Sequence, residues 1–378
     1  MFPLEEAKTG ENIRREILKL LVTRFGLDES SLSKIVWVTD EGANIKLALR
    51  PYQRLDCIDH VIKTVLRHGL DITELSKANG APDIRDTIYA AKSLVRYIKQ
   101  SGLAAQLSTT LLQMGDTRFS TVYLTLTSIQ AVYYELHEKL ATRGESARIE
   151  KIAPDTLVFL IDFLKPFYEA QRELEGDKYP TLIRVCLWCE KLKRHCQPNA
   201  LDSPQQAVLR KRHEDWLARK VIIQDLHKIV TFLWPKFNQL RMLSNSDRNA
   251  VHAHVRTLLQ AMAAGALDVE IRDPGLSGVE PTPPPPKRAN FAEWENVQQA
   301  DWEGDEVTRY IKTAVMENEM DVLGWWKINK SSYPKLAKLA RSVLCIPASS
   351  SSSERVFSAA RRTISERRTA LKPLQWIQ

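Results

Sequence analysis

The chain has 378 residues, of which 44% are hydrophobic, and a formal net charge of +8. This length and apolar content suffice for one large or two ordinary domains, which excludes general disorder. No apolar run approaches the length of a membrane span, and the opening residues MFPLEEAKTG lack the charged start and apolar stretch of a secretory signal. The five cysteines are too few and too scattered for a disulfide framework. We therefore expect an intracellular chain with no membrane partner.

The first 70 residues predict a small α/β part. Apolar residues recur at helical spacing from Ile13 to Phe25, and Gly26 is a typical helix stop. The apolar run from Ile35 to Val38 predicts a strand, which Asp40 follows. A carboxylate at the end of a buried strand can ligate a metal. It can equally cap the helix predicted over EGANIKLALR, and the pattern leaves both interpretations open.

Residues 71–267 have the apolar spacing of helices and predict a helical domain. Within it, Phe119 can stack on a base or complete an apolar stripe with Tyr123. Cys186 and Cys189 fall inside a helical pattern, which argues against a zinc site. The basic residues between 191 and 220 can follow phosphates or form a solvated helix face.

Residues 268–298 contain a dense set of prolines, including the run PTPPPPKR. Proline removes backbone donors and breaks helices, so this stretch predicts an extended linker. The same run could also bind a grooved protein module, although a single match of this kind is weak.

The last part of the chain predicts a pair of helices separated by Pro347. Apolar residues recur at helical spacing from Leu336 to Leu344, and the serines of PASSSSSERVFS can cap a second helix whose first turn contains Glu354. An acid in a first turn is also what the helix dipole alone favours. Residues 341–378 hold seven Lys or Arg and two Glu, a net charge of +5 that is compatible with a nucleic-acid partner but common elsewhere.

In this order, the motifs resemble the hAT superfamily of transposases and their domesticated relatives. The tail matches over residues 321–374, and VTDEGANIKLAL, RLDCIDH and DTRFS follow one another as they do in the family. The resemblance implies an RNase H-like core, a large helical insertion and a C-terminal dimerisation region. Phe119 stands where the family usually has a tryptophan.

The resemblance also implies roles for single residues. Asp40 and Glu354 match the second and third acids of a catalytic triad that binds Mg²⁺, with Cys57 and His60 near the active site. The candidates for DNA contact are Arg118, Phe119, Arg361 and Arg362. The candidates for dimerisation and core packing are Trp325, Trp326, Leu336, Leu339, Val356 and Phe357.

The family's first acid lies on an opening strand upstream of the segment that matches residues 10–40. None of the acids before Asp40 ends a strand-like run. We therefore expect a truncated core and no catalysis, without a cofactor unless an active full-length form uses Mg²⁺. The strand before Asp40 would lack a partner on one side, which predicts that it is poorly ordered, completed by another chain or part of a truncated gene.

The predicted fold is mostly α with a small α/β part. The expected segments are a partial RNase H-like core over residues 1–70, a helical insertion over 71–267, a linker over 268–298 and a dimerisation region over 299–378 that completes the core. We expect a nuclear, transposase-derived protein that forms a homodimer or higher homo-oligomer, binds DNA without catalysis and takes no small-molecule substrate. Two alternatives stay open: a fragment of an active Mg²⁺-dependent transposase, and a protein-interaction module without catalysis.

Overall fold

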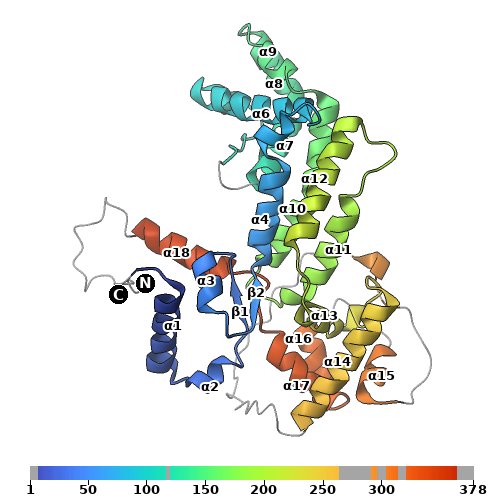
Figure 1. The fold of residues 1–378 in the computed structure, drawn as a ribbon. Coiled ribbons are helices and arrows are strands. Elements are labelled where there is room, and N and C mark those ends of the chain that lie inside the picture. The colour runs from blue at the N-terminus through green and yellow to red at the C-terminus, as the bar shows by residue number, and fades with distance from the viewer. Residues whose placement is uncertain are drawn as a thin grey trace. The chain divides into compact units, whose positions relative to one another are not determined.

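The structure is a computed structural model, and it describes residues 7–115, 120–263, 291–294, 296, 304–313 and 321–363. Most of the described residues are helical (Figure 1), which confirms the prediction of a mostly α chain. The chain forms two compact units. The first contains Met1–Asp59, Leu174–Cys186 and Ile223–Gln378, and the second contains His60–Glu173 and Leu187–Ile222. None of the described helices combines the length and the apolar character that crossing a membrane requires.

The first unit begins with a small α/β layer. Helix α1 covers Gly10–Phe25 and ends at Gly26, whose positive φ of 63° a glycine adopts without steric cost. The short helix α2 covers Glu29–Leu32 and α3 covers Ala43–Ala48. Strands β1 (Trp37–Thr39) and β2 (Arg54–Asp56) pair in parallel, with Thr39 opposite Asp56. The predicted strand is confirmed, although it begins two residues later than the apolar run.

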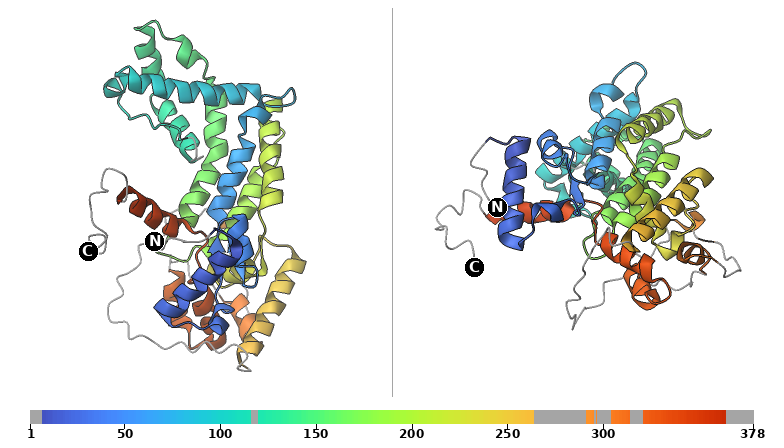
Figure 2. Two further views of the ribbon diagram at one scale, coloured as in Figure 1. Left: turned by 60° about the vertical axis from the view of Figure 1, so that its left-hand side comes forward. Right: turned by 60° about the horizontal axis from the view of Figure 1, so that its bottom comes forward.

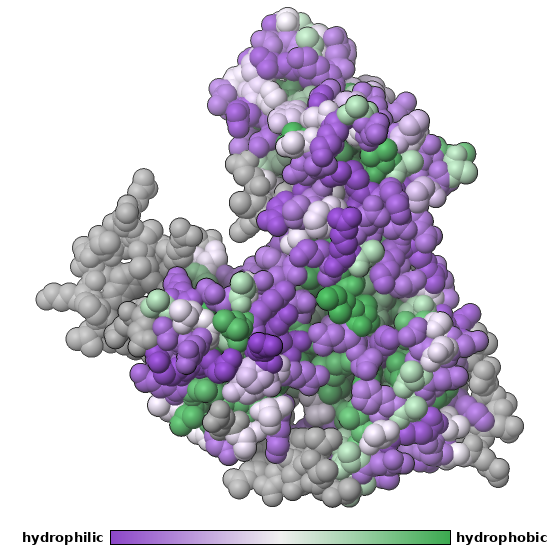
Figure 3. All heavy atoms as spheres, in the orientation of Figure 1, coloured by the Kyte–Doolittle hydropathy of each residue, from purple (hydrophilic) through white to green (hydrophobic). Residues whose placement is uncertain are grey.

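This α/β layer is only half covered. All three residues of β1 are half-buried, and within the described residues β1 pairs with β2 alone. Gly10 is the buried residue of α1, whereas Val22 is 51% exposed and Phe25 is 72% exposed. Hydrophobic residues show among hydrophilic ones on this face in the space-filling view (Figure 3). The layer therefore leaves apolar surface in water.

The helical part of the first unit encloses a cluster of aromatic rings around Tyr310, and the ring of Tyr310 lies within 5.7 Å of those of Phe232, Trp325, Trp326 and Tyr333. Phe291 and Trp294, near the end of the predicted linker, are also buried, with Phe291 against Phe237. The elements of this part are η2 Leu182–Arg184, α13 Asp225–Phe232, η3 Pro235–Phe237, α14 Asn245–Ala263, η4 Ala292–Trp294, α15 Glu306–Ile311, α16 Val322–Asn329, α17 Pro334–Val343 and α18 Ser351–Thr363.

The second unit is helical. Helices α4 (Ile58–Gly69), α10 (Pro154–Leu174) and α12 (Pro204–Lys220) run side by side (Figures 1 and 2). Arg212 of α12 donates to the backbone oxygen of His68 in α4 at 2.8 Å. His213 is fully buried against Phe163 and Phe167. The four segments predicted from the sequence stay predictions. The elements of this unit are α4 Ile58–Gly69, α5 Ile72–Leu75, α6 Pro82–Gln100, η1 Leu103–Gln106, α7 Ser120–Ala131, α8 Tyr133–Ala141, α9 Ala147–Glu150, α10 Pro154–Leu174, α11 Val185–His195 and α12 Pro204–Lys220. The boundary between the two units falls inside three of these helices, so α4, α10 and α11 each contribute one or two residues to the first unit.

Candidate functional site

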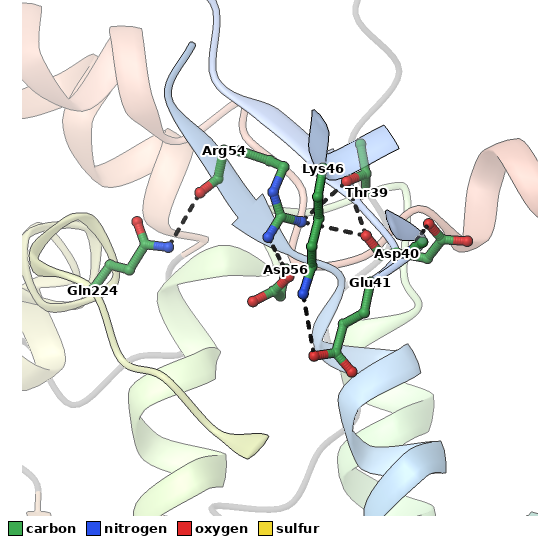
Figure 4. Close-up of polar contacts among 8 residues, drawn as sticks. Thr39, Asp40, Glu41, Lys46, Arg54, Asp56 and Gln224 are labelled. Carbon is green, nitrogen blue, oxygen red and sulfur yellow. Dashed lines mark hydrogen bonds and ion pairs between the residues drawn. The ribbon is translucent and has the colours of Figure 1, made fainter. Parts of the chain in front are cut away.

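Asp40 directly follows the carboxyl end of β1 (Figure 4), and it is exposed to solvent. Its Oδ1 accepts a hydrogen bond from the backbone N–H of Gly42 at 3.1 Å. The N-cap of α3 is Gly42, and no side chain caps this helix. The interpretation of Asp40 as a helix cap is therefore wrong. In a parallel sheet the carboxyl ends of neighbouring strands share one edge, so Asp40 lies beside the end of β2.

Arg54 spans the ends of the two strands (Figure 4). Its Nη2 lies 2.6 Å from Oδ1 of Asp56, and its Nη1 donates to Oγ1 of Thr39 at 3.2 Å and to the backbone oxygen of Asp40 at 3.3 Å. The side-chain amide of Gln224 donates to the backbone oxygen of Arg54 at 3.1 Å. The guanidinium therefore neutralises Asp56, whereas the contact that it makes with Asp40 is to the main chain.

The serine run before α18 is hydrogen-bonded to the chain just after β2. The N–H of Ile58 donates to the oxygen of Ala348 at 3.1 Å, and the N–H of Ser350 donates to Sγ of Cys57 at 3.3 Å. The N–H of Cys57 in turn donates to the oxygen of Thr39 at 2.7 Å. Helix α18 therefore starts at the sheet edge that also carries Asp40.

Glu354 lies in the first turn of α18, as predicted, and its side chain is exposed. Cys57 is fully buried, and His60 is half-buried in the first turn of α4. The structure thus connects three of these four candidates through a short hydrogen-bonded path. That path runs from Thr39, the neighbour of Asp40, through Cys57 to Ser350, whose oxygen accepts from the N–H of Glu354 at 3.1 Å.

The oxygen donors at this edge fit a divalent cation in kind, because Mg²⁺ prefers carboxylate ligands. The number of such side chains is smaller than a metal site needs. Within the residues that the structure describes, no three His, Cys, Asp or Glu side chains form a group that could hold a metal. Asp40 and Glu354 would be two of the ligands, and a third would have to come from elsewhere.

A buried histidine supports the sheet from the side of α13. The N–H of Gln224 donates to Nδ1 of His227 at 3.0 Å, and burial lowers the pKa of His227 to about 4. A neutral imidazole is required in this position, because only the unprotonated nitrogen accepts a hydrogen bond.

The remaining predicted residues separate into three groups. Arg118 and Phe119 lie outside the described residues, and so do the side chains of Arg361 and Arg362. Val356 is 67% exposed and Phe357 is 53% exposed on α18. The other four candidates for dimerisation and core packing are buried: Trp325, Trp326, Leu336 and Leu339.

Comparison with known proteins finds a family match over the C-terminal region and a relative along most of the chain. A model of the hAT family C-terminal dimerisation region matches residues 306–376. The Hobo transposase of Drosophila melanogaster is 26% identical over 405 residues, which cover 93% of this chain and 59% of that protein. These matches support the resemblance of the chain to the hAT superfamily of transposases and transposase-derived proteins.

Two further relatives match this chain over a shorter stretch. The zinc finger BED domain-containing protein DAYSLEEPER of Arabidopsis thaliana is 40% identical over 70 residues, and the putative AC transposase of Zea mays is 34% identical over 71 residues. These matches cover 18% of this chain and 10% and 9% of the two relatives. This chain thus spans less than two thirds of the length of each of these three relatives.

Three residues at the site were missed from the sequence. Asp56 and Asp59 lie within RLDCIDH, the segment that contains Cys57, so their position beside a candidate residue was a usable signal. Thr181, whose Oγ1 accepts from the N–H of Ala348 at 2.9 Å, lies more than 160 positions away from its partner. No spacing rule connects residues that far apart.

Proposed function

We propose that this chain self-associates through α18. The observation that carries the proposal is the exposure of Val356 and Phe357 on a helix inside the hAT dimerisation region. Neighbouring exposed apolar side chains on a helix are typical of an interaction surface. Burying a Phe side chain in such an interface contributes roughly 1.5–3 kcal/mol to the free energy of association.

The tryptophans that the sequence also suggested are less suited to contact a second copy. Trp326 is buried, and its Nε1 donates to the backbone oxygen of Leu233 at 2.8 Å. Trp325 lies against Tyr333, with stacked rings 5.9 Å apart. Both rings already have partners within the chain, so they act on association through the stability of the fold.

The experiment is a measurement of molar mass by light scattering. We expect the wild-type chain to have the mass of a dimer or higher oligomer, and Val356→Ser with Phe357→Ser to have the mass of a monomer. The control is Leu323→Ser with Ile328→Ser on α16, because these residues are also exposed, apolar and within the family region. A control that also becomes monomeric would contradict the assignment to α18, as would a double α18 variant that stays dimeric.

A second candidate function is Mg²⁺-dependent strand cleavage by an RNase H-like core. The observation that supports it is the hydrogen-bonded path from Thr39, the neighbour of Asp40, through Cys57 to Ser350, four residues before Glu354. In such a site the ion neutralises charge on a scissile phosphate. Asp40 and Glu354 would hold it together with a third carboxylate.

Calorimetric titration with Mg²⁺ tests this second candidate without any nuclease assay. We expect Asp40→Asn and Glu354→Gln each to weaken Mg²⁺ binding, and Glu41→Gln to leave it unchanged, because Glu41 is paired with Lys46 at 3.5 Å. Equal heats of Mg²⁺ binding in the wild type and all variants would contradict the proposed metal site.

DNA binding and a nuclear location belong to the same proposal. The net charge of +8 and the similarity to proteins named as transposases support them. Fluorescence anisotropy with a labelled duplex at rising salt would measure the affinity, and imaging of a tagged chain would measure its location. An interaction module without DNA binding would show no salt-dependent anisotropy.

A further inference from the structure

Four separate stretches of the first unit meet where α18 begins. Residues Ala348–Ser351 enter this helix, and they contact Cys57, Asp59, Leu174 and Thr181. We call this set of contacts the α18 latch. Every one of its residues lies in the first compact unit.

The latch consists of five hydrogen bonds between stretches distant in sequence. Two involve Ala348, whose N–H donates to Oγ1 of Thr181 at 2.9 Å and whose oxygen accepts from Ile58 at 3.1 Å. The other three are Ser349 Oγ to the oxygen of Leu174 at 3.1 Å, Ser350 N–H to Sγ of Cys57 at 3.3 Å and Ser351 Oγ to Oδ2 of Asp59 at 3.3 Å.

Burial makes these bonds specific for one position of α18. Cys57, Asp59, Thr181, Ser349 and Ser351 are all buried. A buried donor or acceptor that loses its partner cannot turn to water, and the cost is larger than the gain from forming the bond. A shift of the helix start would break several of these bonds together, so the latch fixes where α18 leaves the core.

The exposed contact of α18 is weaker by comparison. Arg355 pairs with Asp177 at 2.6 Å, but both side chains are about half exposed and the pair is screened by solvent. The buried latch is therefore the main determinant of the helix position.

We infer that Cys57, Asp59 and Thr181 are positioning residues for self-association, because they hold the helix that presents Val356 and Phe357. This inference rests on the proposed role of α18. It gives the Cys57 thiol a function that does not involve chemistry at a substrate. It also means that the thiol reacts only when the latch opens, because Cys57 is fully buried when it is closed.

The experiment measures how fast N-ethylmaleimide labels Cys57 in the full chain, read by mass spectrometry of the peptide. We expect Thr181→Val, which keeps the shape and removes the acceptor of the Ala348 N–H, to raise the labelling rate of Cys57 about five- to ten-fold. Thr181→Ser keeps a hydroxyl and should label at the wild-type rate. Cys189, which is buried in the second unit, serves as the internal control in each sample.

The same variants are then measured for association. We expect the Thr181→Val oligomer to dissociate into monomers at a several-fold higher protein concentration than the wild-type oligomer. Thr181→Ser should associate as the wild type does. Ser351→Ala, which removes the donor to Asp59, is a second variant in case Thr181→Val does not fold, and we expect the same two changes from it.

Labelling and association at wild-type levels in both Thr181→Val and Ser351→Ala would overturn the inference. The proposed role of α18 fails by a different result, a stable dimer in the variant with Val356→Ser and Phe357→Ser. A chain whose latch variants label faster but associate normally would also overturn the inference, because the latch would then be structural only.

Discussion

Two regions of the first unit differ in how completely their apolar side chains are buried. The aromatic cluster around Tyr310 is closed by the chain itself, with Phe232, Trp326 and Tyr333 buried against it. The α/β layer leaves β1 half-buried and the end of α1 in water. Both regions are rich in large apolar side chains, so composition alone does not say which of them forms an interior.

This difference in burial indicates which surfaces are suited to bind a second molecule. A region whose rings already contact one another gains little from a second molecule, whereas exposed apolar side chains gain by burial. Among the described helices of the first unit, such side chains are found on α1, α3, α16 and α18. Of these helices, α16 and α18 lie inside the hAT dimerisation region.

The largest expected effect comes from exchanging Trp326 for phenylalanine in the aromatic cluster around Tyr310. Trp326→Phe leaves the buried oxygen of Leu233 without its donor and opens a cavity, which should lower the free energy of unfolding by about 2–4 kcal/mol. Trp37→Phe is the matched control. Its indole N–H is buried without a partner, so we expect a change within about 1 kcal/mol in urea unfolding. Equal losses in the two variants would contradict the comparison.

The next effect is a loss of stability in acid. Burial holds the pKa of His227 at about 4, below the value of about 6.5 in the unfolded chain. The unfolded state therefore binds a proton first as the pH falls, so stability is complete above pH 6.5 and declines toward pH 4. The loss from this residue reaches at most roughly 3 kcal/mol.

His227→Gln should reduce the slope of stability against pH in this window, because Gln keeps an acceptor for the Gln224 N–H and does not titrate. His213 is also buried with a pKa of about 4, so part of the slope should remain. His254→Gln, at an exposed position of α14, is the control for the substitution itself. An unchanged slope in His227→Gln, from unfolding curves at pH 7, 5.5 and 4.5, would show that His227 is not the source.

A smaller effect is expected where α1 packs on α3. A Cβ at Gly10 would come within 2.7 Å of Cβ of Leu47, so Gly10→Ala should destabilise the chain by about 1 kcal/mol. Leu47→Gly, which removes this Cβ, made alone and in combination completes a double-mutant cycle, and hydrogen exchange of α1 amides reports the local effect. We expect a coupling of about 1 kcal/mol. Independent effects of the two changes would mean that the contact adapts without strain.

The smallest effect should come from the exposed end of α1. Phe25 is mostly in water, so Phe25→Ser should change the free energy of unfolding by less than about 0.5 kcal/mol. Ile17→Ser on the half-buried face of the same helix is the comparison and should cost more. A large loss at Phe25 would indicate that this surface is covered in solution.

The sequence predicted local features better than long-range ones. The stop of α1 at Gly26 and the start of α18 with Glu354 in its first turn follow from residues next to each other, and both are confirmed. The burial of Phe291 and Trp294 was not predicted, because it depends on Phe237, more than 50 positions earlier. Proline content indicates that a segment cannot form a helix or a central strand. It does not indicate whether the aromatic residues that follow are buried.

The candidate site shows the same limit. Motif order led to Asp40, Cys57 and Glu354, and the structure connects the stretches that carry them. The sequence could not separate Trp325 and Trp326 from Val356 and Phe357, because all four lie at helical apolar positions. Only tertiary contacts assign the first pair to the interior and the second pair to the surface.

Hydrogen exchange at two protein concentrations tests the role of α18 most directly. At a concentration high enough for association, we expect amides of residues 351–360 to exchange more slowly than in dilute protein, while those of α17, whose apolar face is already buried, exchange at the same rate. Concentration-independent exchange in α18, with slower exchange in another segment, would show that the chain associates elsewhere and would contradict the account.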